Sequence, residues 1–371
     1  RRRKWPRSEY WGDELVVPKR QSQVLVLGGS GIIGREFVNQ CALAGYTVTS
    51  VSRGQTSERA KDSPGVRWVR GDVRSKDFLE ELGDRRWDFV IDLLSFNPRQ
   101  LTASLGALAD TCSQFVFVSS ATVFDGSKEL TIREDSPFVD SSWSYPRLKL
   151  ECESLLRLTS NRTGLPFTIV RPYITYSDQR ISLGPWEGAE ALGRMARDCA
   201  VPVSSGLQDT VTTLTHAADV ATAIRGLLGN PSALRNDFNV VSDQAVSWDT
   251  VFNLASYLYA HPARMLSVPE ETMLGVFPEL RGKLTDRGQH RRFDISKLRQ
   301  AVPDFVASYS LEQGYASALE AYMSRQLSED IVLYGRQGRL VEGCGSESDL
   351  LAERRFRATL NRSQHVRYLL G

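Results

Sequence analysis

Residues 24–34 read Val-Leu-Val-Leu-Gly-Gly-Ser-Gly-Ile-Ile-Gly, an apolar run followed at once by spaced glycines. The apolar run predicts a strand that is buried on both faces of a parallel sheet, and helical spacing over 36–44 predicts a helix directly after the turn. Glycines in such a unit allow a tight turn, a close approach of the backbone to a pyrophosphate, and close packing of the helix on the strand. The N–H groups at the helix start then face the phosphates. The stretch therefore predicts a dinucleotide-binding unit.

The same alternation of strand and helix continues over about 150 residues, which is the pattern of a doubly wound parallel sheet. Short apolar runs predict the strands, and segments with helical spacing predict the helices between them. The fold class is therefore α/β, a Rossmann arrangement with a smaller C-terminal domain. The expected strands lie at 24–27, 47–51, 66–69, 89–94, 115–118 and 167–170, and the expected helices at 36–44, 75–82, 99–112 and 145–158.

The regular alternation ends after Pro172, and this change divides the chain. Beyond that point the sequence becomes rich in Gly, Pro and Ser, and only a late strand at 238–241 returns to the sheet pattern. The expected parts are an N-terminal arm at 1–20, a Rossmann domain at 21–175 completed by about 211–244, a substrate-binding domain at 176–210 and 245–330, and a C-terminal tail at 331–371.

Composition and charge argue against several classes of protein. The chain has 371 residues, 41% hydrophobic and 24% charged, as in ordinary globular proteins. A formal net charge of +2 gives no global attraction to nucleic acid, and no apolar run approaches the roughly 20 residues that span a bilayer. The five cysteines are scattered without a C-x-x-C pair, and the histidines show no ligand spacing, so neither disulfides nor a metal site is expected. We expect a cytoplasmic protein with a small-molecule substrate and no membrane or nucleic-acid partner.

The end of the second expected strand bears on the choice of cofactor. NAD-binding proteins usually carry an acidic residue there for the ribose hydroxyls, but the sequence reads Val-Ser-Arg-Gly at 51–54. Ser52 and Arg53 can instead accept the additional phosphate of NADP, because arginine pairs well with phosphate; alternatively, Arg53 is exposed or stacks on adenine. The sequence thus favours NADP over NAD. Asp72, within Gly-Asp-Val at 71–73, either lies at the adenine edge or caps the next helix.

Three polar residues carry the candidate chemistry. Ser120 follows the strand at 115–118, at a carboxyl end where open α/β sheets place their ligands. Tyr145 and Lys149 are four positions apart, so they share one face of the next helix. A phenol has an ordinary pKa of about 10, and a nearby ammonium with a positively charged nicotinamide would lower it. Tyr145 would then exchange a proton with a substrate hydroxyl or carbonyl near neutral pH, while Ser120 orients the same oxygen.

These motifs together resemble the extended short-chain dehydrogenase/reductase family, also called the NAD-dependent epimerase/dehydratase family. The resemblance covers about residues 23–325. It implies a bound NAD or NADP, a C-terminal domain that often holds a nucleotide sugar, and frequent homodimers formed through a helix pair. The matching stretches are Gly-Gly-Ser-Gly-Ile-Ile-Gly at 28–34, Gly-Asp-Val at 71–73, Ser-Ser-Ala-Thr-Val-Phe at 119–124, Tyr-Pro-Arg-Leu-Lys at 145–149, Arg-Pro at 171–172 and Thr-His-Ala-Ala-Asp-Val-Ala at 215–221.

The resemblance also implies roles for individual residues, with the three glycines of the turn at the pyrophosphate. The expected catalytic residues are Ser120, Tyr145 and Lys149, and the lysine is also expected to reach the nicotinamide ribose. The expected cofactor-binding residues are Gly28, Ser30, Gly31, Ile32, Ile33, Gly34, Ser52, Arg53, Asp72, Val73, Leu93, Tyr145, Lys149 and Pro172. The expected substrate-binding residues are Ser120, Thr122 and Arg287.

Several positions depart from the family pattern. The threonine often found before the first glycine is Leu27, the tyrosine usual after the serine motif is Phe124, and an arginine that holds a sugar-nucleotide phosphate appears as Thr212. Arg287 either serves such a phosphate or is a surface arginine. The acidic pair of a typical 4,6-dehydratase does not occur at 121–122, which favours an epimerase or a ketoreductase.

The favoured interpretation is an NAD(P)-dependent oxidoreductase or epimerase acting at a secondary alcohol or ketone of a nucleotide-activated sugar, with Tyr145 as acid and base. The loss of arginine at Thr212 leaves open an NADPH-dependent reductase of a non-sugar biosynthetic intermediate. The third alternative is a Rossmann-like, RNA-associated binding protein, since some distant relatives of the family bind RNA and the chain has basic ends. Trp143, Trp186 and Phe96 are interpreted as core residues more readily than as pocket residues.

Overall fold

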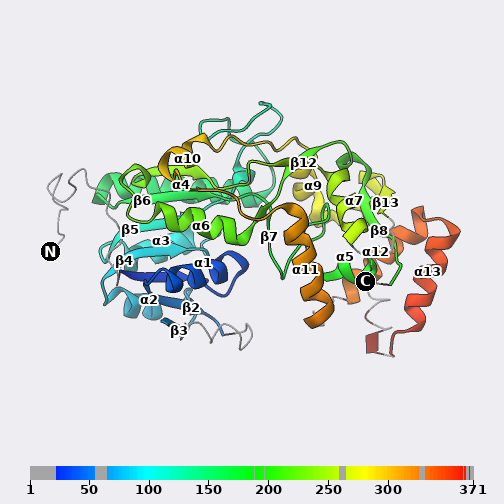
Figure 1. The fold of residues 1–371 in the computed structure, drawn as a ribbon, viewed down its shortest axis with the longest axis horizontal. Coiled ribbons are helices and arrows are strands. Elements are labelled where there is room, and N and C mark those ends of the chain that lie inside the picture. The colour runs from blue at the N-terminus through cyan, green and yellow to red at the C-terminus, as the bar shows by residue number, and fades with distance from the viewer. Residues whose placement is uncertain are drawn as a thin grey trace.

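Figure 1 shows two parts of the molecule, a central sheet covered by helices and a smaller domain beside it. The N-terminal arm expected at 1–20 lies outside the described residues. The computed structural model describes residues 22–54, 65–187, 189–195, 197–258, 265–325, 331–361, 363–364 and 367.

The central sheet has seven parallel strands in the order β11-β6-β5-β4-β1-β2-β3. The chain builds outward from β1 to β3 and then continues from β4 on the other side of β1, so the Rossmann arrangement predicted from the sequence is confirmed. The order reverses between β1 and β4, which is where open α/β sheets bind ligands. The strands are β1 (Gln23–Leu27), β2 (Thr47–Ser52), β3 (Val66–Arg70), β4 (Trp87–Asp92), β5 (Cys112–Val118), β6 (Phe167–Arg171) and β11 (Asn236–Asn239).

Helices cover both faces of the sheet, and β1 shows why. Val24 and Val26 are buried in one apolar cluster, whereas Leu25 and Leu27 are buried in another, because successive side chains of a strand point to opposite faces. A strand that is apolar on both faces has to be covered on both. One face carries α1 (Ile32–Leu43) and α6 (Ala217–Leu227), and the other carries α2 (Lys76–Gly83), α3 (Pro98–Leu108) and α4 (Ser144–Thr163) (Figure 1).

The smaller domain has its own apolar core, in which Trp248 is fully buried. Its short strands pair two by two rather than joining the central sheet. Strands β7 (Thr175–Tyr176), β8 (Val201–Ser204), β9 (Val211–Thr213), β10 (Thr215–His216), β12 (Ala245–Ser247) and β13 (Met265–Val268) belong to these pairs. The helices of this domain include α5 (Ala189–Met195), α7 (Trp248–Leu258), α8 (Glu270–Val276), α9 (Arg281–Arg287) and α11 (Leu311–Arg325). Helix α10 (Ser296–Ala301) instead packs against β11 of the central sheet.

The C-terminal segment contains two helices, α12 (Ile331–Cys344) and α13 (Glu347–Ala358), where the sequence pattern predicts no element. Arg194 of α5 donates to Glu353 of α13 at 2.5 Å, and both side chains are buried. Phe356 of α13 is also buried against Cys199. The sequence gives little sign of this packing because the buried face of α13 mixes acidic and apolar residues, Asp349, Ala352, Glu353 and Phe356. None of the helices in the described part of the chain combines the length and apolarity that a membrane span requires.

Candidate active site

A cavity of about 1360 Å³ lies at the carboxyl ends of the central strands and extends to the smaller domain. Ordinary ligand pockets measure about 300–1,000 Å³, so this one has room for a dinucleotide and a second molecule. One side, the cofactor half, is lined by the glycine turn at 28–34 together with Arg53, Asp72, Val73 and Leu93. The other side, the substrate half, is lined by Trp143, Arg180, Glu187, Lys283 and Arg287.

The glycine turn has the geometry of a phosphate cradle. Gly28 adopts a φ of +96°, which side chains disfavour, and a Cβ on Gly34 would lie 2.4 Å from the Gly28 carbonyl oxygen. A Cβ on Gly31 would meet nothing closer than 3.5 Å, because this residue faces the open cavity. Helix α1 begins at Ile32 without a side-chain cap and without an acidic residue in its first turn. Its first N–H groups are therefore available to an anion, and the turn fits a dinucleotide diphosphate.

The adenosine end of the cofactor half departs from the expectation at one position. Arg53 lines the cavity, but Ser52 does not, and its hydroxyl accepts a hydrogen bond from the Gly54 N–H at 3.4 Å. Asp72 lies in the cavity wall, where its carboxylate accepts from the backbone of Arg74 at 3.0 Å. Ser75, not Asp72, caps α2, so the capping interpretation of Asp72 is wrong.

Ser120 and Tyr145 come together in the cavity wall. Ser120 ends the extended segment after β5 and accepts hydrogen bonds from the backbone N–H of Thr122 at 3.3 Å and from its hydroxyl at 3.0 Å. The Ser120 hydroxyl lies beside the phenol of Tyr145, and both residues line the cavity. Burial raises the pKa of Tyr145, and the nearby Ser120 hydroxyl and the charge of Arg180 only partly oppose this. The phenol therefore carries its proton at neutral pH.

Lys149 lies one turn further along α4 and is buried. Its ammonium donates to the Ser95 carbonyl at 2.9 Å and to the Val118 carbonyl at 2.8 Å, which ties α4 to the ends of β4 and β5. It also lies 4.6 Å from the centre of the Phe96 ring. Burial lowers the pKa of Lys149 to about 8. The lowered pKa that the sequence led us to expect for Tyr145 is not found in the protein by itself, because burial of the phenol dominates.

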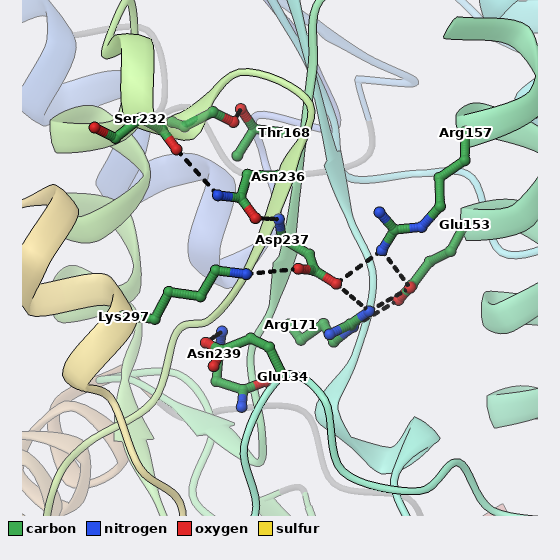
Figure 2. A network of polar contacts seen from close by, with 11 residues as sticks. Glu134, Glu153, Arg157, Thr168, Arg171, Ser232, Asn236, Asp237, Asn239 and Lys297 are labelled. Carbon is green, nitrogen blue, oxygen red and sulfur yellow. Dashed lines mark hydrogen bonds and ion pairs between the residues drawn. The ribbon is translucent and has the colours of Figure 1, made fainter. Parts of the chain in front are cut away.

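A buried ion network behind the cavity holds α4 on the sheet (Figure 2). Glu153 of α4 accepts from the Arg171 guanidinium of β6 at 2.9 and 2.6 Å and from the Ser119 hydroxyl at 2.6 Å. Arg171 also donates to Asp237 of β11 at 2.7 Å, and Lys297 donates to the other oxygen of Asp237 at 2.9 Å. Glu153 thus joins the helix of Tyr145 to the residue beside Ser120.

Glu153 and Asp92 are absent from the set of residues expected from the motifs, although the sequence carries a signal for each. Tyr145, Lys149 and Glu153 follow at intervals of four, so all three share one face of α4. For Asp92 the signal is a carboxylate at the end of a buried strand, which is unusual. It accepts from the N–H groups of Leu94 and Ser95 at 2.9 Å and shapes the loop that lines the cavity after β4.

Two aromatic residues that we interpreted as core line the cavity instead. Phe96 is 46% exposed and covers the Lys149 ammonium. Trp143 precedes Tyr145, and their ring centres are 5.4 Å apart. Trp186 is a core residue as expected, with its indole N–H donating to the Pro202 carbonyl at 2.5 Å. An aromatic residue next to a polar site residue has the same sequence signature whether it packs inward or faces a ligand.

The substrate half gathers charged residues that are distant in sequence. Arg287 is 3% exposed, and its guanidinium is paired with the Glu187 carboxylate. Arg180 and Lys283 reach the other Glu187 oxygen at 2.8 and 3.1 Å. Thr212 is fully buried in β9 and is not among the residues that line the cavity.

A glycine turn at the point where the strand order reverses places this chain in the class of dinucleotide-binding Rossmann proteins. The model of the NAD dependent epimerase/dehydratase family matches residues 24–241, more than half of the chain. The chain belongs to this family.

Curated relatives carry more than one description. The chain is 30% identical over 252 residues to the chloroplast stem-loop binding protein of 41 kDa b from Arabidopsis thaliana, covering 64% of this chain and 63% of that one. It is 28% identical over 203 residues to a UDP-glucose 4-epimerase from Azospirillum brasilense, covering 50% and 54%. A 2'-dehydrokanamycin reductase from Streptomyces kanamyceticus is 25% identical over 302 residues, covering 78% and 82%. The chain thus spans less than two thirds of the length of the Arabidopsis and Azospirillum relatives.

Solved structures agree with the fold. An epimerase from Methanothermobacter thermautotrophicus superposes with a TM-score of 0.70 at 16% identity, over 82% of this chain and 93% of that one. The UDP-glucose 4-epimerase from Bifidobacterium longum, solved with NAD+ and UDP, superposes with a TM-score of 0.67 at 20% identity, over 82% and 99%. At these identities the likeness establishes the fold alone.

Proposed function

We propose that the chain is an NAD(P)-dependent oxidoreductase or epimerase acting at a secondary alcohol or ketone of a nucleotide-activated sugar. The observation that carries the proposal is that Ser120 and Tyr145 lie side by side in the wall of the cavity that the glycine turn also lines. Membership of an NAD-dependent family supports it. A proton-transfer group and a phosphate cradle on one cavity are what reversible oxidation of an alcohol requires.

The cofactor would be held by residues of the cofactor half. Gly28, Gly31 and Gly34 would contact the diphosphate, Asp72 and Val73 the adenine side, and Lys149 the nicotinamide ribose, with the rest of the expected set around them. When bound, the nicotinamide accepts or supplies a hydride. We further propose a preference for NADP, because Arg53 lines the cavity and β2 ends without a carboxylate.

The chain's own residues would manage the proton and the substrate oxygen. Ser120 would hydrogen-bond the substrate oxygen and fix its position beside Tyr145. In the reducing direction, the protonated Tyr145 phenol would give its proton to that oxygen. In the oxidising direction, the phenolate form of Tyr145 would take the hydroxyl proton, which nearby positive charge favours. Lys149 would keep α4 in place through its bonds to the Ser95 and Val118 carbonyls.

A nucleotide sugar fits the substrate half because its diphosphate needs cations. Arg180, Lys283 and Arg287 provide three, and Ser120 and Thr122 lie in the cavity wall as partners for sugar hydroxyls. The test is a panel of UDP-, GDP- and dTDP-sugars with NAD or NADP. Stabilisation against heat by one class of nucleotide sugar, together with turnover seen as an epimer or as a change in nicotinamide absorbance, is the expected result. Turnover of unphosphorylated ketones alone would contradict the proposed substrate.

Two specific observations support alternatives. The relative named as a 2'-dehydrokanamycin reductase and the protonated phenol of Tyr145 favour a reductase of another intermediate. NADPH oxidation by small ketones, without nucleotide sugars, would identify it.

The Arabidopsis relative named as a stem-loop binding protein favours RNA association. Salt-dependent binding of a stem-loop RNA that persists without cofactor would identify that function.

We also propose a homodimer formed through helices of the sheet domain, because α4 exposes Leu158, which is 60% exposed. Light scattering of the purified protein would measure its mass.

The location we propose is the cytoplasm. All five cysteines lie among the described residues and none forms a disulfide, which fits a reducing compartment. Since the Arabidopsis relative is described as chloroplastic, a fluorescent fusion of the natural full-length protein would decide between the two compartments.

A further inference from the structure

One carboxylate in the substrate half is shared by three cations. One oxygen of Glu187 accepts from Arg287, and the other accepts from Lys283 at 3.1 Å and forms an ion pair with Arg180 at 2.8 Å. All four side chains line the cavity. The carboxylate therefore occupies the place at which the positive charges of this wall converge.

The wall remains positive even with Glu187 ionised. Burial raises the pKa of Glu187, but the three cations outweigh it and lower that pKa to about 2, so the carboxylate keeps its single charge at neutral pH. Asp286, the other acid in this wall, is paired with Arg291 at 2.5 Å and accepts from Tyr173 at 2.9 Å. Three formal positive charges thus face one negative charge, which leaves an excess of two.

An excess of two positive charges matches a phosphate or diphosphate better than a carboxylate. Arginine forks and the lysine ammonium bind phosphoryl oxygens well, and a diphosphate offers more acceptor oxygens than Glu187 does. The Glu187 side chain is 24% exposed, and those of Arg180 and Lys283 are 36% and 27% exposed. Glu187 can therefore turn toward solvent while the more deeply buried Arg287 stays in place.

We propose that Arg180, Lys283 and Arg287 form an anion subsite for substrate phosphate, and that Glu187 is its internal ligand, which the incoming phosphate displaces. The inference rests on the proposed function for the identity of that phosphate. It also accounts for Thr212: the arginine that the family pattern places there is replaced by charge from Arg180 and Lys283, at other points of the chain. Glu187 then sets the affinity, since each phosphate has to compete with it.

The test measures binding of inorganic pyrophosphate by titration calorimetry, with the protein saturated with NADP so that the glycine turn is occupied. Replacing the competing carboxylate by a neutral amide, Glu187→Gln, is expected to tighten pyrophosphate binding about tenfold or more. Glu279→Gln is the matched control, because Glu279 pairs with Arg336 in the same domain but is not among the cavity-lining residues. This control is expected to bind as the unaltered protein does.

Two further variants keep the test decisive. The double variant that adds Lys283→Gln to Glu187→Gln is expected to lose most of the gain in pyrophosphate affinity, because one of the three cations is lost. If Glu187→Gln does not fold, Glu187→Asp shortens the reach of the carboxylate and is expected to give a smaller gain. Unchanged or weaker pyrophosphate binding in the folded variants overturns the proposal.

Pyrophosphate carries no nucleoside or sugar, so the two proposals can fail separately. Tighter pyrophosphate binding without turnover of any nucleotide sugar would keep the anion subsite and reject the proposed substrate. Turnover of a nucleotide sugar with no response to Glu187→Gln would keep the function and reject the role of Glu187.

Discussion

The two halves of the cavity are built in different ways. The cofactor half comes mainly from single strand–turn–helix units, above all β1, the glycine turn and α1. The substrate half joins Glu187 to Lys283 and Arg287, which lie 96 and 100 residues away along the chain. The cofactor half is fixed by local backbone geometry, whereas the substrate half depends on how the smaller domain folds against the sheet. Changes in the first should therefore affect any reaction of the cavity, and changes in the second should affect which molecule reacts.

The largest expected effect is at Tyr145, which serves both halves. Tyr145→Phe removes the hydroxyl that exchanges the proton, so turnover should fall about 100- to 10,000-fold. Binding of NADP and of substrate should change little, because the ring remains. Steady-state rates and cofactor titration would measure the two effects. Undiminished turnover in Tyr145→Phe would exclude the proton-transfer role.

The next prediction separates the folding of the glycine turn from its binding of the cofactor. In Gly34→Ala the new methyl group would lie 2.4 Å from the Gly28 carbonyl and 2.7 Å from the Gly29 Cα. These are backbone atoms, so the turn has to shift, and both thermal stability and NADP binding should be lost. Gly31→Ala is the matched control, since its methyl group meets nothing closer than 3.5 Å. Gly31→Ala should fold normally, and only its binding of NADP should weaken. Equal thermal stability of the two variants would contradict the proposed geometry of the glycine turn.

A third change removes the link behind the cavity. Glu153→Gln removes one of the two carboxylates that pair with the buried Arg171 and leaves Asp237 as its charged partner. The loss should cost about 3 kcal/mol of unfolding free energy. A neutral amide accepts more weakly from the Ser119 hydroxyl than the carboxylate does. The helix that carries Tyr145 is then held less firmly, so kcat should fall more than KM changes. Glu151→Gln, on the same helix, breaks an exposed pair with Arg147 and should cost less than about 1 kcal/mol. Denaturant unfolding compares the unfolding free energies of the two variants. Equal losses of stability would show that the network is dispensable.

The smallest expected effect concerns cofactor choice. Arg53→Ala should lower the affinity for NADP about tenfold, because it removes a charged hydrogen bond to phosphate. The affinity for NAD should remain nearly unchanged. Arg70→Ala is the control, because Arg70 packs beside Gly54 but is not among the residues that line the cavity. Fluorescence titration of both cofactors measures the ratio. An equal loss for NAD and NADP would place Arg53 against adenine instead.

The same contrast explains how far the sequence could be interpreted. The sheet, the helices of the Rossmann domain and the glycine turn follow from short-range patterns, because strand burial and helical spacing are visible in consecutive residues. Glu187 and Lys283 could not be found, since an isolated acid and an isolated lysine carry no sign of their partners about 100 positions away. Ser52 remains a prediction: it ends β2 as the pattern indicates, its hydroxyl accepts from the Gly54 N–H, and it is not among the residues that line the cavity. The pattern does not predict α13 because its buried face includes Glu353, whose partner Arg194 lies far away in the chain.

The most direct measurement is a crystal structure of the protein with NADP and a UDP-sugar. The expected result is the diphosphate of NADP at the glycine turn, facing the first N–H groups of α1, with the nicotinamide beside Tyr145 and the substrate oxygen within hydrogen-bonding distance of Tyr145 and Ser120. A dinucleotide bound outside the glycine turn, or a nicotinamide distant from the Tyr145 hydroxyl, would contradict the proposed chemistry.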